Sequence, residues 1–170
     1  RQVKKLLGLP DMRTWIGVRD RVIFELFYCT GMRRKELAAV KVAHCHLLER
    51  RMLVTDGKGG KQRWVPIAKK VVGIVQQYLQ QARPALLRDK VHDTLLVGDT
   101  GVPLSNKRLS EIVGSYLKRL GVKSGCHGLM HSCATHLLKG KANIRVIHEL
   151  LVHAELSSTH IYTHVDINDM

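Results

Sequence analysis

The chain has 170 residues, a length typical of one domain with a sizeable hydrophobic core. Hydrophobic residues make up 45% of it and charged residues 25%, which is ordinary for a folded protein and excludes a disordered chain. No apolar run approaches the ~20 residues of a membrane-spanning helix, which argues against a membrane protein. Lysine and arginine total 28 against 14 acidic residues, so the net charge is +14. This excess predicts a polyanionic partner, most often nucleic acid, although a basic surface that only maintains solubility is the alternative.

The first half of the chain predicts helices followed by a hairpin. Apolar residues at three- and four-residue spacing predict a helix over residues 14–29, which Thr30 and Gly31 end. A second helix is expected to start around Met32. Two strands are expected over residues 51–56 and 63–67, joined by a glycine-rich turn into an antiparallel hairpin with a basic tip.

The second half is expected to be mostly helical. A helix is expected over residues 68–81 and is ended by Pro84, and a short strand over residues 95–97 precedes a turn at 99–101. Ser105 is expected to open a helix that runs to about Leu120. Three further helical segments are expected over residues 128–139, 143–152 and 155–162. The predicted fold class is therefore mainly α with a small antiparallel β-sheet, in a single domain without internal repeats.

The histidines and cysteines are also informative. Seven of the ten histidines follow residue 126, more than core packing would supply, and imidazole can move protons near neutral pH. The four cysteines form no C-x-x-C pair, and a chain of this size does not need disulfides. We therefore expect a reduced, intracellular compartment.

Five short segments form four motifs, whose order and spacing are more specific than any one of them. The segments are TGMRRKEL at 30–37, GKGGKQR at 57–63, HGLMHSCATHLL at 127–138, and LLVHA at 150–154 followed by IYTHV at 161–165. Together they resemble the catalytic domain of the tyrosine recombinases, the phage-integrase and Xer-like site-specific DNA recombinases. The resemblance covers residues 10–166 and implies the fold of that catalytic domain.

The resemblance implies DNA cleavage without metal or cofactor. In this family a tyrosine oxygen attacks a backbone phosphate, forms a 3′-phosphotyrosyl bond and releases a 5′-hydroxyl, so the bond energy stays in the covalent intermediate. Tyr162 matches this nucleophile, because it lies nine residues after His153 as the family pattern requires. On position alone, a structural tyrosine at a helix end would be the alternative.

Positive groups must stabilise the charge on the phosphate in the transition state. Arg33 matches the first arginine of the family, whose fork donates two hydrogen bonds to a phosphate, and His153 matches the late histidine that donates to the same phosphate. Glu36 lies three residues after Arg33 and is expected to orient it. A solvated helix arginine is the alternative for Arg33, and it is the interpretation we favour for Arg34.

The remaining matches concern protons and DNA contact. Lys58 matches the hairpin lysine that protonates the departing 5′-oxygen in this family, and His127 matches the proton acceptor for the tyrosine. His131 is expected to give a supporting hydrogen bond or to pack. The alternatives are a solvated lysine-rich turn and structural histidines. The candidate DNA-binding residues are Arg34, Lys61 and Arg63.

Two positions depart from the family pattern. Met130 occupies the place of the second arginine, three residues after His127, and a thioether brings no positive charge. Loss of one donor to the transition state typically costs about 10²–10³ in rate, so impaired cleavage is expected. Val152 replaces the glycine that usually precedes the histidine, and its branched side chain is expected to crowd the backbone.

The resemblance also implies how the chain works with its partners. Residues 1–170 are expected to be one catalytic domain, without the N-terminal domain that completes the clamp around DNA and without the extreme C-terminal segment. Duplex DNA and other recombinase protomers on that DNA are the expected partners, with weak DNA affinity and a monomer in isolation. A bacterial or phage-derived, cytoplasmic and DNA-associated protein is expected.

Other classes of protein remain as alternatives. A recombinase relative that binds DNA without cutting it is kept open by Met130. A zinc protein is more remote: His127 and His131 share a helix face, but residue 128 is glycine where zinc proteases have glutamate, and the cysteines lack zinc spacing. A serine hydrolase is not supported, because there is no G-x-S-x-G motif.

Overall fold

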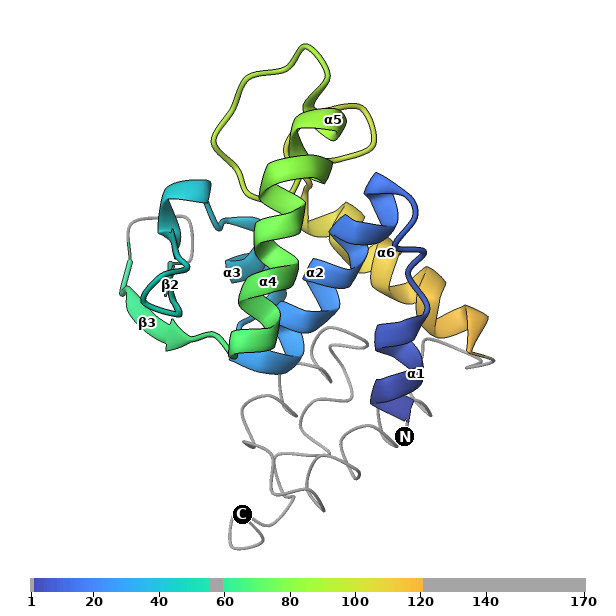
Figure 1. The fold of residues 1–170 in the computed structure, drawn as a ribbon, viewed down its shortest axis with the longest axis horizontal. Coiled ribbons are helices and arrows are strands. Elements are labelled where there is room, and N and C mark those ends of the chain that lie inside the picture. The colour runs from blue at the N-terminus through green and yellow to red at the C-terminus, as the bar shows by residue number, and fades with distance from the viewer. Residues whose placement is uncertain (1, 56–59, 121–170) are drawn as a thin grey trace, which may run out of the picture.

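The computed structural model describes residues 2–55 and 60–120, and the structural statements below concern these two ranges. Figure 1 shows strands β2 and β3 at one side of a helical body, with α4 beside α2. The helices are α1 (Gln2–Gly8), α2 (Trp15–Thr30), α3 (Arg34–Ala38), η1 (Val42–His44), α4 (Lys69–Gln77), η2 (Tyr78–Ala82), α5 (Arg83–Leu87) and α6 (Asn106–Arg119), and the strands are β1 (Cys45–His46), β2 (Arg51–Val54) and β3 (Arg63–Pro66). The predicted fold class, mainly helical with a small antiparallel sheet, is confirmed.

Helix α2 is the centre of the described fold and confirms the helix expected over residues 14–29. The Thr14 side chain caps it by accepting a hydrogen bond of 2.9 Å from the Gly17 amide. Of the predicted apolar stripe, Val18, Val22 and Leu26 are buried and Trp15 is exposed, whereas Ile23, Phe24 and Phe27 on the other sides are buried as well. Helices α1, α4 and α5, the η2 segment and strand β3 all contact α2. A helix buried nearly all round holds the elements at both of its ends in fixed positions.

Gly31 ends α2 as predicted, by adopting a left-handed conformation. Its φ is 66°, a region that favours glycine, and its amide donates to the Phe27 carbonyl at 3.1 Å. The following helix begins later than expected, at Arg34 and not at Met32, because Arg33 has an extended backbone (φ −74°, ψ 154°) as the residue that precedes α3. The turn therefore delivers Arg33 at the N-terminal end of a short helix.

The sheet has the order β1-β2-β3 and is antiparallel throughout. Met52 lies opposite Val65, and their side chains are buried together with Val54, whereas Trp64 on the other face is 43% exposed. This alternation is what a sheet with one buried face requires. The predicted pairing of the two hairpin strands is confirmed. Strand β1 was not expected, because a strand of two residues leaves no periodic pattern.

The helix expected over residues 68–81 does not end before Pro84. Helix α4 continues through the π-helical segment η2 into α5, and Pro84 lies in the first turn of α5. The π-helical turn before Pro84 is wider than an α-helical turn and accommodates the proline ring within the continuing helix. The prediction that Pro84 terminates the helix was therefore wrong.

The segment that leads to α6 confirms the turn at 99–101 but not the strand over 95–97. Two isolated bridges, Lys41 with Thr94 and Val97 with Pro103, replace the expected strand. The predicted apolar face of α6 is buried, and Ser105 caps its start by accepting from the Arg108 amide at 3.1 Å. The helices expected over residues 128–139, 143–152 and 155–162 lie outside the described residues.

Candidate functional site

Arg33 lies where α2 turns into α3, and its side chain is exposed. Two hydrogen bonds of the Thr30 side chain stabilise the turn before Arg33. The Thr30 hydroxyl donates to the Leu26 carbonyl at 2.6 Å and accepts from the Met32 amide at 3.2 Å. Met32 is completely buried. A buried side chain and two side-chain hydrogen bonds immediately before Arg33 fix the path of the backbone that carries it.

Glu36 is the buried partner of this turn and contacts Arg33 through the backbone amide of that residue. One carboxylate oxygen, Oε1, accepts from the Arg33 amide at 2.8 Å, which closes the first turn of α3. The residue is only 7% exposed. A carboxylate this buried needs donors on both oxygens, and a second residue provides them.

Arg63, at the start of β3, is that second residue. Its guanidinium donates from Nη1 to Glu36 Oε2 at 2.5 Å and from Nη2 to Glu36 Oε1 at 3.0 Å, a two-pronged ion pair. The Arg63 side chain is 31% exposed and that of Glu36 is 9% exposed. The structure thus joins the first two motifs, which are 27 residues apart at this pair. The sequence pattern placed Arg63 among DNA contacts and gave no signal for this pairing.

The two other candidate DNA-binding residues differ in their surroundings. Lys61 is exposed, which agrees with a role in contacting DNA. Arg34 is half-buried, and its Nη1 donates to the Ser110 hydroxyl on α6. The interpretation of Arg34 as a solvated helix arginine was therefore wrong, because this contact ties α3 to α6. The other candidate residues lie outside the described residues: Lys58, His127, Met130, His131, His153 and Tyr162.

A second charged cluster, which the sequence did not predict, ties α2 to α6 and the loop before it. Arg19 is 1% exposed and Asp20 is 3% exposed. Arg19 donates to Asp20 Oδ1 at 2.9 Å, to the Val97 carbonyl at 3.1 Å and to Asp99 Oδ1 at 2.8 Å. The Tyr116 hydroxyl donates to Asp20 Oδ2 at 2.6 Å. Buried charges at adjacent positions of one helix leave no periodic signal, which is why the pattern missed them.

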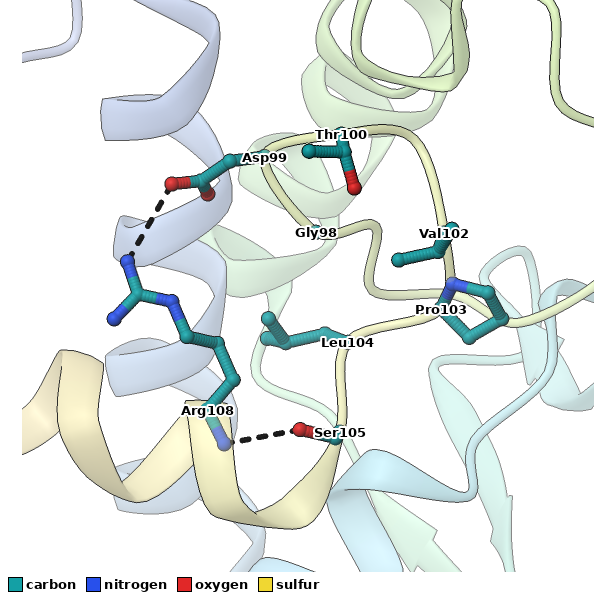
Figure 2. Close-up of a pocket in the computed structure, with 8 residues that line it drawn as sticks. All are labelled: Gly98, Asp99, Thr100, Val102, Pro103, Leu104, Ser105 and Arg108. Atoms are coloured by element: carbon teal, nitrogen blue, oxygen red, sulfur yellow. Dashed lines mark hydrogen bonds and ion pairs between the residues drawn. The ribbon is translucent and has the colours of Figure 1, made fainter.

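The pKa values of the two carboxyl groups in this cluster are shifted in opposite directions. Burial raises the pKa of Asp20 above its ordinary value, and the attraction of Arg19 only partly opposes this. The hydrogen bond from Arg19 lowers the pKa of Asp99, which is more exposed to water. Figure 2 shows Arg108 reaching from the first turn of α6 to the Asp99 carboxylate, at 3.4 Å. The cluster is structural, because its charges are used in pairing.

The pocket in Figure 2 lies beside this cluster and not beside Arg33. Its volume is about 290 Å³, and it is lined by Gly98, Asp99, Thr100, Val102, Pro103, Leu104, Ser105 and Arg108. None of the candidate site residues within residues 2–55 and 60–120 lines it. Its two charged side chains are paired with each other, so it offers no unpaired charge for a ligand.

Metal and membrane features were searched in the described ranges. There, no three histidine, cysteine, aspartate or glutamate side chains gather into a group that could hold a metal ion. The histidine pair of the zinc alternative, His127 and His131, lies outside these ranges. Within residues 2–55 and 60–120, no helix is both long enough and apolar enough to cross a membrane.

The sequence matches the phage integrase family over residues 1–169, a longer stretch than the motifs covered. The chain therefore belongs to this family. Among its relatives, the tyrosine recombinase XerD of Listeria innocua is 39% identical over 166 residues, which are 96% of this chain and 56% of that protein. The tyrosine recombinase XerC 2 of Ralstonia nicotianae is 37% identical over 171 residues, 99% of this chain and 49% of that protein. The chain spans about half the length of these curated relatives.

Solved structures give the same family. The crystal structure of XerA recombinase matches with a TM-score of 0.69 and 28% identity, covering 99% of this chain and 60% of that one. A post-cleavage complex of the XerH site-specific recombinase with a palindromic difH substrate matches with a TM-score of 0.66 and 27% identity, covering 98% of this chain and 49% of that one. The expected recombinase catalytic-domain fold is confirmed.

Proposed function

We propose that this chain cuts and rejoins DNA strands at specific sites through a 3′-phosphotyrosyl intermediate. Membership of the phage integrase family supports the proposal, as do relatives named tyrosine recombinases and a structural neighbour bound to its DNA substrate. The net charge of +14 supports duplex DNA as the partner, because phosphates attract a basic surface. The observation that carries the proposal is the arrangement around Arg33.

That arrangement brings two motifs of the family into one place. Arg33 is exposed at the N-terminal end of α3. Glu36, which accepts from the Arg33 amide, is paired with Arg63 at the start of β3. Lys58 lies five residues before Arg63 in the sequence, between the residues that form β2 and β3. An exposed arginine on a fixed backbone, joined through Glu36 to the strand that follows Lys58 in the sequence, supports a phosphate-binding centre, which needs positioned positive donors.

The proposed chemistry assigns one role to each residue. The Tyr162 oxygen attacks the phosphorus, and its proton passes to His127. Arg33 and His153 donate to the non-bridging oxygens, where negative charge grows in the transition state. Lys58 protonates the 5′-oxygen as its bond to phosphorus breaks. Rejoining reverses these steps with a 5′-hydroxyl as the attacking group, so neither metal nor nucleotide is consumed.

Met130 makes the proposed cleavage slower than in relatives with two arginines. A thioether leaves one side of the transition-state phosphate without a charged donor, and one such donor typically contributes about 10²–10³ in rate. The same residue favours a second candidate function, a recombinase relative that holds DNA without cutting it. Both functions require duplex DNA, and both allow assembly of several protomers on the DNA from a monomeric free state.

Suicide substrates test the proposal and separate the two functions. Duplexes are selected by binding from a randomised pool, and the best-bound sequence is then nicked at successive positions so that a cleaved strand end diffuses away. We expect a covalent protein–DNA adduct that survives denaturation, and no adduct with Tyr162→Phe. DNA binding without an adduct at any nick position, with Met130→Arg as well as the unaltered chain, would establish the non-cleaving function.

A further inference from the structure

The ion pair between Arg63 and Glu36 has a geometry that a flexible DNA contact would not have. The two terminal guanidinium nitrogens each donate to one oxygen of the same carboxylate, Nη1 to Oε2 at 2.5 Å and Nη2 to Oε1 at 3.0 Å. The carboxylate is the buried partner and the guanidinium is partly buried, so the pair is shielded from water on the glutamate side. A guanidinium that donates to a buried carboxylate in this way is bound by the protein itself.

The same carboxylate also accepts a hydrogen bond from the backbone amide of Arg33. Oε1 of Glu36 accepts from Arg63 Nη2 and from the Arg33 amide at 2.8 Å, so one oxygen joins the two arginines. If the Arg63 fork is lost, Glu36 loses one donor on each carboxylate oxygen, Nη1 on Oε2 and Nη2 on Oε1. A buried carboxylate that loses donors moves toward water, and the hydrogen bond that closes the turn at Arg33 then weakens.

We infer that Arg63 is a positioning residue that holds Arg33 in place through Glu36. The inference rests on the proposed function, in which Arg33 binds the phosphate. Arg63 also links α3 with β3, because it is the first residue of β3, the strand that follows Lys58 in the sequence. A shift of this strand is transmitted through one carboxylate to Arg33, and small misplacements of a positioned group typically reduce rates by large factors.

Arg63→Lys separates positioning from DNA contact, because lysine keeps the positive charge but cannot reproduce the fork. Three quantities are measured: the rate of adduct formation at saturating nicked duplex, the affinity for that duplex over a series of salt concentrations, and the hydrogen exchange of the Arg33 amide by NMR. The cleavage rates are measured in the unaltered chain and in the Met130→Arg background. Arg51→Lys is the matched control, since Arg51 lies on the adjacent strand β2 and pairs with Glu49 at 2.7 Å.

A positioning role for Arg63 predicts a specific set of results for these variants. Arg63→Lys lowers the cleavage rate at saturating DNA about 10-fold or more, leaves the affinity and its salt dependence unchanged, and speeds exchange of the Arg33 amide about 10-fold. Arg51→Lys leaves all three quantities within about twofold. After Glu36→Gln, the additional Arg63→Lys substitution has little further effect on the rate, because the link is already broken.

Two results overturn the inference. An affinity loss whose salt slope falls by about one, with the rate at saturating DNA unchanged, would make Arg63 a phosphate contact. Exchange of the Arg33 amide that is the same in Arg63→Lys as in the unaltered chain would show that the link does not operate. If no variant forms an adduct, the proposed function fails, and the Arg33 amide exchange alone then decides whether Arg63 holds the turn.

Discussion

The buried cluster around Arg19 gives a stability prediction that can be worked from the structure. Arg19→Met replaces the guanidinium with an unbranched apolar side chain of similar reach. The substitution removes the donors to Asp20, to Asp99 and to the Val97 carbonyl. Asp20 is then a buried carboxylate that retains the Tyr116 hydroxyl as a donor but has lost the positive charge beside it.

The cost follows from burial. Breaking a buried ion pair by removing one partner typically costs about 3–5 kcal/mol, because the remaining charge has neither water nor a counter-charge. We expect the free energy of unfolding to fall by about 3 kcal/mol at pH 7, a large part of the ~5–15 kcal/mol of a typical domain. Asp20 already has a raised pKa, so proton uptake relieves part of the penalty. The deficit of the variant should therefore be smaller at pH 5 than at pH 7.

Arg13→Met is the matched control. Arg13 also pairs with an aspartate, Asp11, at 3.0 Å, but the Arg13 side chain is 91% exposed. A surface pair of this kind contributes less than about 1 kcal/mol. Urea unfolding followed by circular dichroism measures both variants against the unaltered chain. Equal losses for Arg19→Met and Arg13→Met would refute the reasoning that burial sets the cost.

Three further predictions concern acid stability, catalysis and binding. Asp99 has a lowered pKa in the folded chain because of the hydrogen bond from Arg19, so its contribution is present above its ordinary pKa and is lost as the pH falls through the lowered value. Because water screens this 44% exposed carboxylate, Asp99→Asn should lower the unfolding free energy by less than about 1 kcal/mol at pH 7 and by progressively less below pH ~4; a difference independent of pH would contradict this. Met130→Arg should raise the rate of adduct formation by about 10²-fold or more, and an unaltered chain that is already as fast would show that Met130 is no defect. The logarithm of the DNA affinity should fall steeply with the logarithm of salt concentration, and a flat dependence measured by fluorescence anisotropy would count against phosphate contact by the basic surface.

The elements that the sequence predicted well have a single buried face. Helix α6 is the clearest case, since its apolar stripe and its capping Ser105 both appear in the pattern. Helix α2 was found, but its burial on nearly all sides was not, because periodicity reports only one stripe. Pro84 misled the prediction, since a proline marks the start of a helix as well as an end, and local sequence does not show which.

The candidate site shows the same division between local and distant information. The sequence connected Arg33 with Glu36 by their three-residue spacing in a helix expected to start around Met32. In the structure Arg33 precedes α3 with an extended backbone, and its amide donates to Glu36. The bond between Glu36 and Arg63 spans 27 residues and depends on how the sheet packs against α3, which no local pattern reports. The Arg34 contact with Ser110 spans 76 residues and was missed for the same reason.

The central claim, that Tyr162 carries out strand cleavage, is tested most directly by mapping the covalent bond in the adduct. The adduct on the best-bound nicked duplex is digested with protease and nuclease, and mass spectrometry then locates the attached nucleotide. The account predicts one nucleotide joined through its 3′-phosphate to the oxygen of Tyr162, with a free 5′-hydroxyl on the released strand. Attachment at another residue, or through a 5′-phosphate, would contradict it.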